Sequence, residues 1–159
     1  MRAWRIRQAT KDDAEAMARL HHETVHTVNV RDYSAAQVHA WAPARLSAED
    51  MRCRQHGKLV WVAEDGDRLI GFIELDRDGH MACLYSHKDY QRCGVGTQLL
   101  ASLTAHAEQA GLGRLYAEVS ITARPFFERY GFCVVREQQV ERHGVRLTNF
   151  VMERLLVES

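Results

Sequence analysis

The chain has 159 residues, of which 46% are hydrophobic and 26% are charged. This balance is typical of a globular protein and excludes a disordered or fibrous chain. The 21 basic residues equal the 21 acidic ones, which argues against a protein that binds nucleic acid through overall positive charge. No linker or repeat divides the chain, so we expect a single domain over residues 1–159.

No apolar run approaches the roughly 18 to 20 residues that cross a bilayer, and the first residues lack the apolar core of a signal peptide. We therefore expect a cytoplasmic protein with no membrane partner. The four cysteines are widely spaced and form no C-x-x-C pair, which disfavours a disulfide scaffold or a cysteine-type zinc site. Most of them are expected to be small apolar side chains. They are Cys53, Cys83, Cys93 and Cys133.

The first third of the chain is mainly helical in pattern. Residues 5–9 are predicted to form a short strand, and residues 10–13 (Thr-Lys-Asp-Asp) have the sequence of a capping box. Apolar residues then recur at near-helical spacing, which predicts a helix to about Val28. A second helix is expected from Ser34, which has a glutamine three residues later. The stretch 46–57 holds one more short helical turn.

Strand patterns and turn residues dominate the middle of the chain and predict an antiparallel meander. An amphipathic helix, a short strand, a second helix capped by Thr122 and a final hairpin follow. The expected strands are 59–64, 69–75, 80–86, 115–119, 133–141 and 145–153. The order β-α-α-β-β-β-α-β-α-β-β predicts an α/β fold with a mixed, mostly antiparallel sheet flanked by helices.

The most informative segment is Gln91-Arg92-Cys93-Gly94-Val95-Gly96, which lies between a strand and a helix. Glycines lack a β-carbon and let a ligand approach the backbone closely. The unpaired N–H groups of the helix start suit a phosphate or pyrophosphate. Neither the dinucleotide-binding fingerprint nor a P-loop is present, and glycines that serve only tight packing remain the alternative.

Several ordered motifs resemble the GCN5-related N-acetyltransferase (GNAT) family. Residues 91–96 resemble the family's loop for the pyrophosphate of acyl-CoA, and residues 85–90 resemble the approach to that loop. Residues 123–132 (Ala-Arg-Pro-Phe-Phe-Glu-Arg-Tyr-Gly-Phe) resemble its fourth-helix signature, and residues 5–13 its first strand and helix. The resemblance extends from about Arg5 to Val151 and implies the small, single-domain bacterial form of this fold.

The resemblance implies an acetyltransferase in which an amine attacks the thioester of bound acetyl-CoA directly, without an acyl-enzyme. Acetyl-CoA is then the cosubstrate, no metal is needed, and the partner is an amine acceptor. Backbone groups of the fourth strand would bind the pantetheine arm and the thioester carbonyl, and donors aimed at that carbonyl would form an oxyanion hole. The implied cofactor-binding residues are Leu84, Tyr85, Ser86, Gln91, Arg92, Cys93, Gly94, Val95, Gly96, Thr97, Ser120 and Phe127.

The general acid departs from the family pattern. The tyrosine that often protonates the leaving thiolate corresponds to Phe127 here, and a phenyl ring has no proton to donate. Tyr130 follows one helical turn later, on a neighbouring position. Tyr130, Tyr85 and a water remain alternatives for the general acid. A strict acid is not required, because a thiol with a pKa of about 8.5 can also leave as the thiolate.

The general base is chosen from three residues. An amine with a pKa around 10 is mostly protonated at neutral pH, so a group must accept its proton. Glu118 is the first candidate, because some family members have a basic glutamate on the fifth strand. Glu74 and His80 are the alternates. For each, a surface or paired side chain without a catalytic role is the competing interpretation.

The first two helices form the wall of the acceptor site in this family, which makes His26 and Tyr33 candidate substrate contacts. Trp41 is a further candidate, although a core position suits it equally. His22 and His26 lie one helical turn apart, which is a possible metal spacing, but no third ligand is evident. Cys93 is expected to be a tolerated loop residue without special reactivity.

Two functions from different classes follow from these patterns. The first is an N-acetyltransferase that works in a ternary complex with acetyl-CoA and a primary amine. The second is a non-catalytic acyl-CoA binding or sensing module, motivated by Phe127 at the usual acid position. The fold does not choose the acceptor, and we expect a monomer or homodimer with no nucleic-acid partner.

Overall fold

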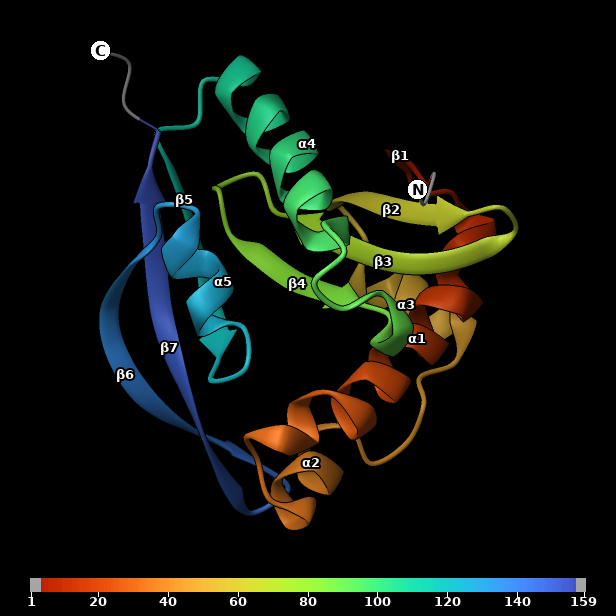
Figure 1. Ribbon diagram of the computed structural model, residues 1–159, viewed down its shortest axis with the longest axis vertical. Coiled ribbons are helices and arrows are strands. Elements are labelled where there is room, and N and C mark those ends of the chain that lie inside the picture. Colours follow the sequence, from red (N-terminus) through yellow and green to blue (C-terminus); the bar gives the residue numbers. More distant parts are fainter. Residues whose placement is uncertain (1–3, 157–159) are drawn as a thin grey trace.

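The computed structural model describes residues 4–156, which form two antiparallel sheets with helices packed on both faces (Figure 1). The expected order of elements is confirmed, and the short turn predicted within 46–57 is a helix of its own, α3. The helices are α1 (Ala14–Thr27), α2 (Ala35–Trp41), α3 (Ala48–Arg54), α4 (Val95–Gln109) and α5 (Arg124–Arg129). The strands are β1 (Arg5–Gln8), β2 (Leu59–Asp65), β3 (Arg68–Leu75), β4 (Met81–Ser86), β5 (Arg114–Ser120), β6 (Cys133–Arg142) and β7 (Val145–Leu155).

Local capping residues fix the starts of the first helices. Thr10 and Asp13 form the predicted capping box, and Asp13 also binds Arg7 of β1 at 2.8 Å. At the start of α2, the Gln37 backbone N–H donates to the Ser34 hydroxyl at 3.1 Å. The Ser34 N–H donates in turn to the Gln37 side chain at 2.9 Å. Each bond gives a backbone N–H at the start of the helix a side-chain acceptor, and this stabilises the helix start.

One predicted cap is wrong. The helix α5 begins after Ala123, whose N–H donates to the Ser120 hydroxyl at 3.1 Å. The Thr122 hydroxyl is buried and has no hydrogen-bond partner within residues 4–156. The hydroxyl of Ser120, at the end of β5, reaches the backbone donor first, so Thr122 is left inside the turn.

Within residues 4–156, a single β-bridge joins the two sheets. Strands β1-β2-β3-β4 form one sheet and β5-β7-β6 the other, and every ladder in both is antiparallel. An isolated parallel bridge between His80 and Tyr116 joins β4 to β5, and the Tyr116 N–H donates to the Gly79 carbonyl at 3.1 Å. Beyond this junction the two strands separate, so the sheets enclose a V.

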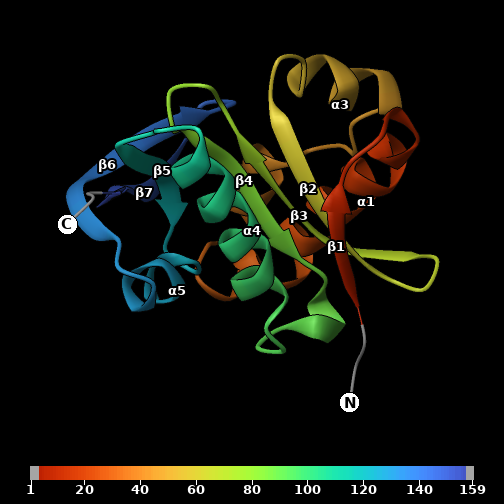
Figure 2. The same cartoon turned by 90° about the horizontal axis from the view of Figure 1, so that it is seen from above.

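Separate apolar clusters lie on the two faces of the sheets. The larger cluster lies under α4 and α5, where Leu99 and Leu103 are fully buried. A second cluster, around Met17 and Phe72, lies under α1 and α3, on the other side of the first sheet (Figure 2). Each fully buried side chain of this size contributes about 1.5–3 kcal/mol. The helices thereby hold the two sheets at a fixed separation.

The cysteines are less buried than expected. All four are free, and three of them are exposed: Cys53, Cys93 and Cys133. The expectation of small apolar side chains therefore fits only Cys83, which lies on β4 against the second cluster.

Replacement of Gly79 by alanine should open the junction. Gly79 has φ +98°, and a β-carbon there would lie 2.1 Å from the carbonyl oxygen of Arg114. The backbone of β5 must therefore move, and we expect a loss of more than about 2 kcal/mol in the free energy of unfolding, measured by urea denaturation. Gly66→Ala is the matched control, because Gly66 has φ +62° and nothing within 4 Å of the added carbon. Equal losses in the two variants would contradict a close approach at this junction.

Candidate active site

A cleft of about 970 Å³ occupies the V between β4 and β5. Its walls are the separated parts of these two strands, the glycine loop with the start of α4, and α5. Asn29 and Asp32, in the segment after α1, and Trp41 of α2 line the end of the cleft that faces away from the sheet junction. The sheet junction itself forms the closed end of the cleft, and the glycine loop lies along the side of the cleft.

The strand β4 offers unpaired backbone groups to this cleft. Its register with β3 shifts between Ile73 and Leu75, where β4 has one extra residue and bulges before Leu84. On its other edge, no ladder with β5 follows the bridge at His80 within the described chain. The Ser86 carbonyl, at the end of β4, accepts from the Thr24 hydroxyl at 3.2 Å and from the Gln91 side chain at 2.8 Å. The N–H and C=O groups that precede it along that edge have no partner strand and can bind a ligand that lies extended in the cleft.

The glycine loop turns sharply into α4. Arg92 has φ +60° and Gly94, the residue before the helix, has φ +95°. The first N–H groups of a helix have no intrahelical acceptor, so those that follow Gly94 are free donors at the positive end of the helix dipole. The Gln91 side chain donates to the carbonyls of Ser86 and His87 at 2.8 and 3.2 Å. The loop is thus fastened to the end of β4.

Phe127 of α5 and Tyr130, which directly follows this helix, differ in their surroundings. Phe127 is 4% exposed, and its ring packs edgewise on Phe132 with centroids 5.1 Å apart. The Tyr130 hydroxyl lies 2.9 Å from the Thr97 hydroxyl of α4, and both residues line the cleft. Tyr130 therefore presents a hydroxyl group at the cleft, whereas Phe127 forms part of its apolar floor.

Glu118 lies on β5 with its side chain 42% exposed, and it lines the cleft. Its carboxylate is 2.7 Å from Nε2 of His80, and Nδ1 of the same ring is 3.1 Å from Asp76. The hydrogen bond from His80 lowers the pKa of Glu118. The bond to Glu118, and then that to Asp76, raise the pKa of His80 against the opposing effect of burial. The three groups form a continuous chain of hydrogen bonds.

The alternates Glu74 and Tyr85 lie in different surroundings. Glu74 is 3% exposed, accepts a hydrogen bond from Gln55 at 2.9 Å, and is not among the residues that line the cleft. Tyr85 lines the cleft, but its ring packs edgewise on His21 at 4.8 Å, and its hydroxyl accepts from the Trp41 side chain. Burial strongly raises the pKa of Tyr85. Both side chains are thus engaged in packing.

The two predicted acceptor contacts make structural hydrogen bonds. Nε2 of His26 lies 2.7 Å from the carbonyl of Ala42, which ties α1 to the end of α2. The Tyr33 hydroxyl donates to the Thr148 carbonyl at 2.7 Å and accepts from the Ile121 N–H at 2.9 Å. Tyr33 is 6% exposed, and burial raises its pKa. Neither residue is among those that line the cleft.

Several residues of the cleft carry no signal in the sequence that marks them as functional. Asn29 and Asp32 belong to no motif, and Arg129 on α5 has no role of its own within the fourth-helix signature. Asp76, which lies behind the cleft, falls among the turn residues between two predicted strands. Its distance of four residues from His80, across a tight turn, was the available signal for a paired carboxylate and imidazole.

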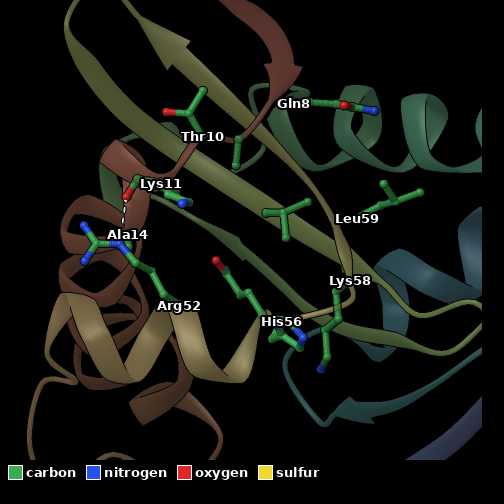
Figure 3. A pocket seen from close by; sticks show the side chains of 11 residues that line it. Gln8, Thr10, Lys11, Ala14, Arg52, His56, Lys58 and Leu59 are labelled. Atoms are coloured by element: carbon green, nitrogen blue, oxygen red, sulfur yellow. Dashed lines mark hydrogen bonds between the residues drawn. The ribbon is translucent and has the colours of Figure 1, made fainter.

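A second, smaller hollow of about 370 Å³ lies on the outer side of the first sheet, between β1, β2 and α3 (Figure 3). Basic side chains surround it, namely those of Lys11, Arg52 and Lys58. Arg52 is engaged there, because its Nε donates to the Lys11 carbonyl at 3.1 Å. This hollow shares no residue with the cleft.

Neither a membrane span nor a metal cluster is found in the part of the chain that the structure describes. Between Trp4 and Leu156, no helix is both long and apolar enough to cross a bilayer. Over the same residues, His, Cys, Asp and Glu form no group of three that could hold a metal ion. His22 and His26 stack on each other instead, with ring centroids 4.3 Å apart.

Known proteins resemble this chain over nearly its whole length. The family model described as "Acetyltransferase (GNAT) domain" matches residues 29–154. The uncharacterized N-acetyltransferase YafP of Escherichia coli (strain K12) is 32% identical over 147 residues, which cover 92% of this chain and 93% of YafP. The GCN5-related N-acetyltransferase (aminotransferase, class-II) of Rhodopseudomonas palustris has a TM-score of 0.91 at 29% identity, over 98% of both chains.

A more distant structure shares the fold. The PaiA N-acetyltransferase of Thermoplasma acidophilum, solved in complex with coenzyme A, has a TM-score of 0.76 at 21% identity, over 96% of this chain and 99% of PaiA. Together with the family match, this defines the class: the protein is an acetyl-CoA-dependent acyltransferase. More particularly, the chain belongs to the GNAT family of acetyltransferases.

Removal of the Tyr33 hydroxyl should destabilise the protein. Tyr33→Phe leaves the partly buried Ile121 N–H and Thr148 carbonyl without their partner. We expect the free energy of unfolding to fall by about 1–3 kcal/mol in urea denaturation. Tyr116→Phe is the control, since its hydroxyl donates to the exposed Asp78, which water can solvate. A smaller loss for Tyr33→Phe than for Tyr116→Phe would show that the Tyr33 bonds contribute little.

Proposed function

We propose that the protein transfers the acetyl group of acetyl-CoA to a primary amine by direct attack on the thioester in a ternary complex. The observation that carries this proposal is the cleft between β4 and β5, which has a helix start at its side and a carboxylate near its closed end. Family membership supports the acyl donor. The acceptor and the roles of individual residues are our inference from the geometry.

Acetyl-CoA would bind along β4 and across the start of α4. The loop from Arg92 to Thr97 suits the pyrophosphate, because the backbone N–H groups after Gly94 lie at a helix N-terminus, which attracts anions. The pantetheine arm would extend along the free edge of β4, at Leu84, Tyr85 and Ser86. Ser120 and Phe127 would contact it from the opposite wall. PaiA holds coenzyme A on the same fold, which supports this placement.

Acyl transfer requires charge stabilisation at the thioester and two proton movements. A backbone N–H near the β4 bulge would stabilise the oxyanion that forms when the amine attacks the carbonyl. Glu118 would accept one proton from the amine. When the C–S bond breaks, Tyr130 would protonate the leaving thiolate and regain a proton from the nitrogen, which loses its second proton as the amide forms. The position of Tyr130 beside Thr97 favours it over the buried Tyr85 as the donor.

The acceptor end is closed by Asn29, Asp32 and Trp41. A carboxylate and an indole ring suit a cationic amine, through charge pairing and cation–π contact. We place the body of the amine acceptor against this wall, with its reacting nitrogen directed along the cleft toward Glu118. His26 and Tyr33, which are held by other hydrogen bonds, shape this wall from behind. We further propose that the protein works in the cytoplasm as one domain, a monomer or homodimer without nucleic acid.

A second candidate function is a non-catalytic acyl-CoA binding or sensing module. Phe127 favours it, since the buried ring cannot protonate the leaving thiolate. The paired Glu118 and the cleft-lining Tyr130 favour catalysis. Release of CoA over a panel of amines separates the two: turnover supports the transferase, and binding without turnover supports the sensor.

Calorimetric titration with acetyl-CoA tests the binding site. Arg92→Ala should weaken acetyl-CoA binding several-fold at low salt, because it removes a cation beside the pyrophosphate. The same variant should bind acetyl-pantetheine, which lacks the pyrophosphate, as the unmodified protein does. Arg142→Ala, in the exposed hairpin between β6 and β7, is the control and should change neither affinity. Equal loss for both ligands with Arg92→Ala would contradict the placement of the pyrophosphate.

Substitution of Glu118 tests the base. Glu118→Gln keeps the shape but cannot accept a proton, so kcat should fall by about 10²–10⁴-fold while acetyl-CoA affinity stays unchanged. Tyr130→Phe should reduce kcat less, because a thiolate with a pKa near about 8.5 leaves without full protonation. CoA release measured with the best amine of the panel checks both. Full activity of Glu118→Gln would remove Glu118 from the mechanism.

A further inference from the structure

We propose that Glu118 and His80 act together as one proton acceptor, in which the proton of the amine passes through Glu118 and comes to rest on His80, while Asp76 holds the imidazole in place. This proposal deepens the proposed function and rests on it. His80 is a positioning residue in this scheme, because it acts through Glu118 and not on the substrate directly.

The two contacts of the imidazole carry the argument. Nε2 lies 2.7 Å from Glu118 and Nδ1 lies 3.1 Å from Asp76, and an ionised carboxylate can only accept hydrogen bonds. A neutral imidazole has a single N–H and can satisfy only one of these two acceptors. Both contacts are hydrogen bonds when His80 is an imidazolium. The arrangement is therefore built to hold one proton between two carboxylates.

The sheet junction fixes this arrangement in space. The turn between β3 and β4 is fastened to β5, because the Tyr116 N–H donates to the Gly79 carbonyl at 3.1 Å and its hydroxyl donates to Asp78 at 2.5 Å. The His80 N–H donates to Asp78 at 3.1 Å, and the His80 ring lies on the Tyr116 ring with centroids 5.0 Å apart. The imidazole therefore has little freedom to leave Glu118.

Other charges surround the pair from every neighbouring element. Lys58, just before β2, is 4.0 Å from Asp76, and Arg114 lies over the Tyr116 ring at 4.3 Å. Arg136 of β6 acts on Glu118 and lowers its pKa further. At His80 the two direct carboxylate contacts outweigh the opposing effect of burial, and the pKa of His80 is raised.

The pairing makes Glu118 a better base than an isolated carboxylate. A carboxylate with a lowered pKa is far too acidic to retain a proton taken from an ammonium ion of pKa about 10. When His80 is neutral, however, the proton that Glu118 accepts moves on to Nε2, which is much more basic. The pair thus has the basicity of the histidine and not that of the carboxylate. The pKa of His80 is raised and that of Glu118 is lowered, and a general base works best when its pKa is near the working pH.

The protons balance over one turnover. The substrate ammonium gives one proton through Glu118 to His80, and the freed lone pair of the nitrogen attacks the thioester carbon. The C–S bond breaks, and the second proton of the nitrogen accompanies the formation of the CoA thiol. His80, now an imidazolium, returns its proton to solvent, which reaches the partly exposed Asp76. One amide, one thiol and one released proton result.

The pH dependence follows with a definite sign. The pair accepts a proton only when His80 is neutral, so kcat/KM should rise with pH through the raised pKa of His80, above 6.5. Asp76→Asn keeps an acceptor for Nδ1–H but removes a negative charge, so the rise should move to lower pH. His80→Gln keeps a donor for Glu118 but cannot take the proton. It should abolish this rise and lower kcat/KM at pH 7 by about 10–100-fold.

An NMR titration of the imidazole protons in the full chain tests the pair without turnover. The His80 resonance is identified by its loss in His80→Gln, and its pKa should lie above 6.5 and fall in both Asp76→Asn and Glu118→Gln. His56→Gln, at an exposed histidine outside the cleft, is the matched control and should leave the His80 titration and the pH–rate profile unchanged. Should Asp76→Asn fail to fold, Glu118→Gln gives the same comparison.

Three results would overturn the proposal. They are a His80 pKa at or below 6.5, a pKa that both carboxylate substitutions leave in place, and a pH–rate profile that is the same in His80→Gln as in the unmodified protein. Failure of the proposed function gives a different pattern: acetyl-CoA binds and no amine releases CoA, while the titration still shows whether Glu118 and His80 share the proton.

Discussion

The single junction between β4 and β5 is the constraint on which the rest of the structure depends. Two strands that paired along their whole length would bury the backbone groups that a cofactor needs, and two strands that never met would leave the sheets to move independently. Here the chain pairs at His80 and Tyr116 and nowhere further along these strands within residues 4–156. The close approach of Gly79 to Arg114 permits this contact, and packing of α4 and α5 over both sheets preserves the opening.

The same junction determines the electrostatics of the cleft. Glu118 lies near its closed end and is backed by His80 and Asp76, whereas the donors of the glycine loop and the start of α4 lie along its side. This separation suits the proposed ligands, because a cosubstrate with phosphates and an amine with a positive charge are attracted to different parts of one cleft. The net charge of zero contributes nothing to this separation. The local arrangement of a few groups produces it.

Features that depend on neighbouring residues could be predicted from the sequence. The caps at Thr10 and Ser34 and the glycine turn before α4 act over a few residues, and each is present. The Thr122 cap failed although it is local, because Ser120 competes for the same donor. Contacts between distant segments could not be predicted from the sequence. The Tyr33 hydroxyl bonds to residues 88 and 115 positions away, and Glu118 contacts His80 across 38 positions. The identity of Glu118 as a candidate came from resemblance, and its partner came only from the fold.

The proposed mechanism also explains why Phe127 can stand at the usual position of the general acid. A thiol with a pKa near about 8.5 is a good leaving group, whereas an ammonium ion with a pKa around 10 is a poor nucleophile until it loses a proton. In the proposed mechanism the greater chemical demand therefore falls on the base, where this chain places three hydrogen-bonded groups. Phe127 contributes to the apolar core at 4% exposure, and the nearby Tyr130 retains a hydroxyl in the cleft. A packing residue at the acid position then costs this mechanism little, because the proposed difficult proton transfer is the one at Glu118.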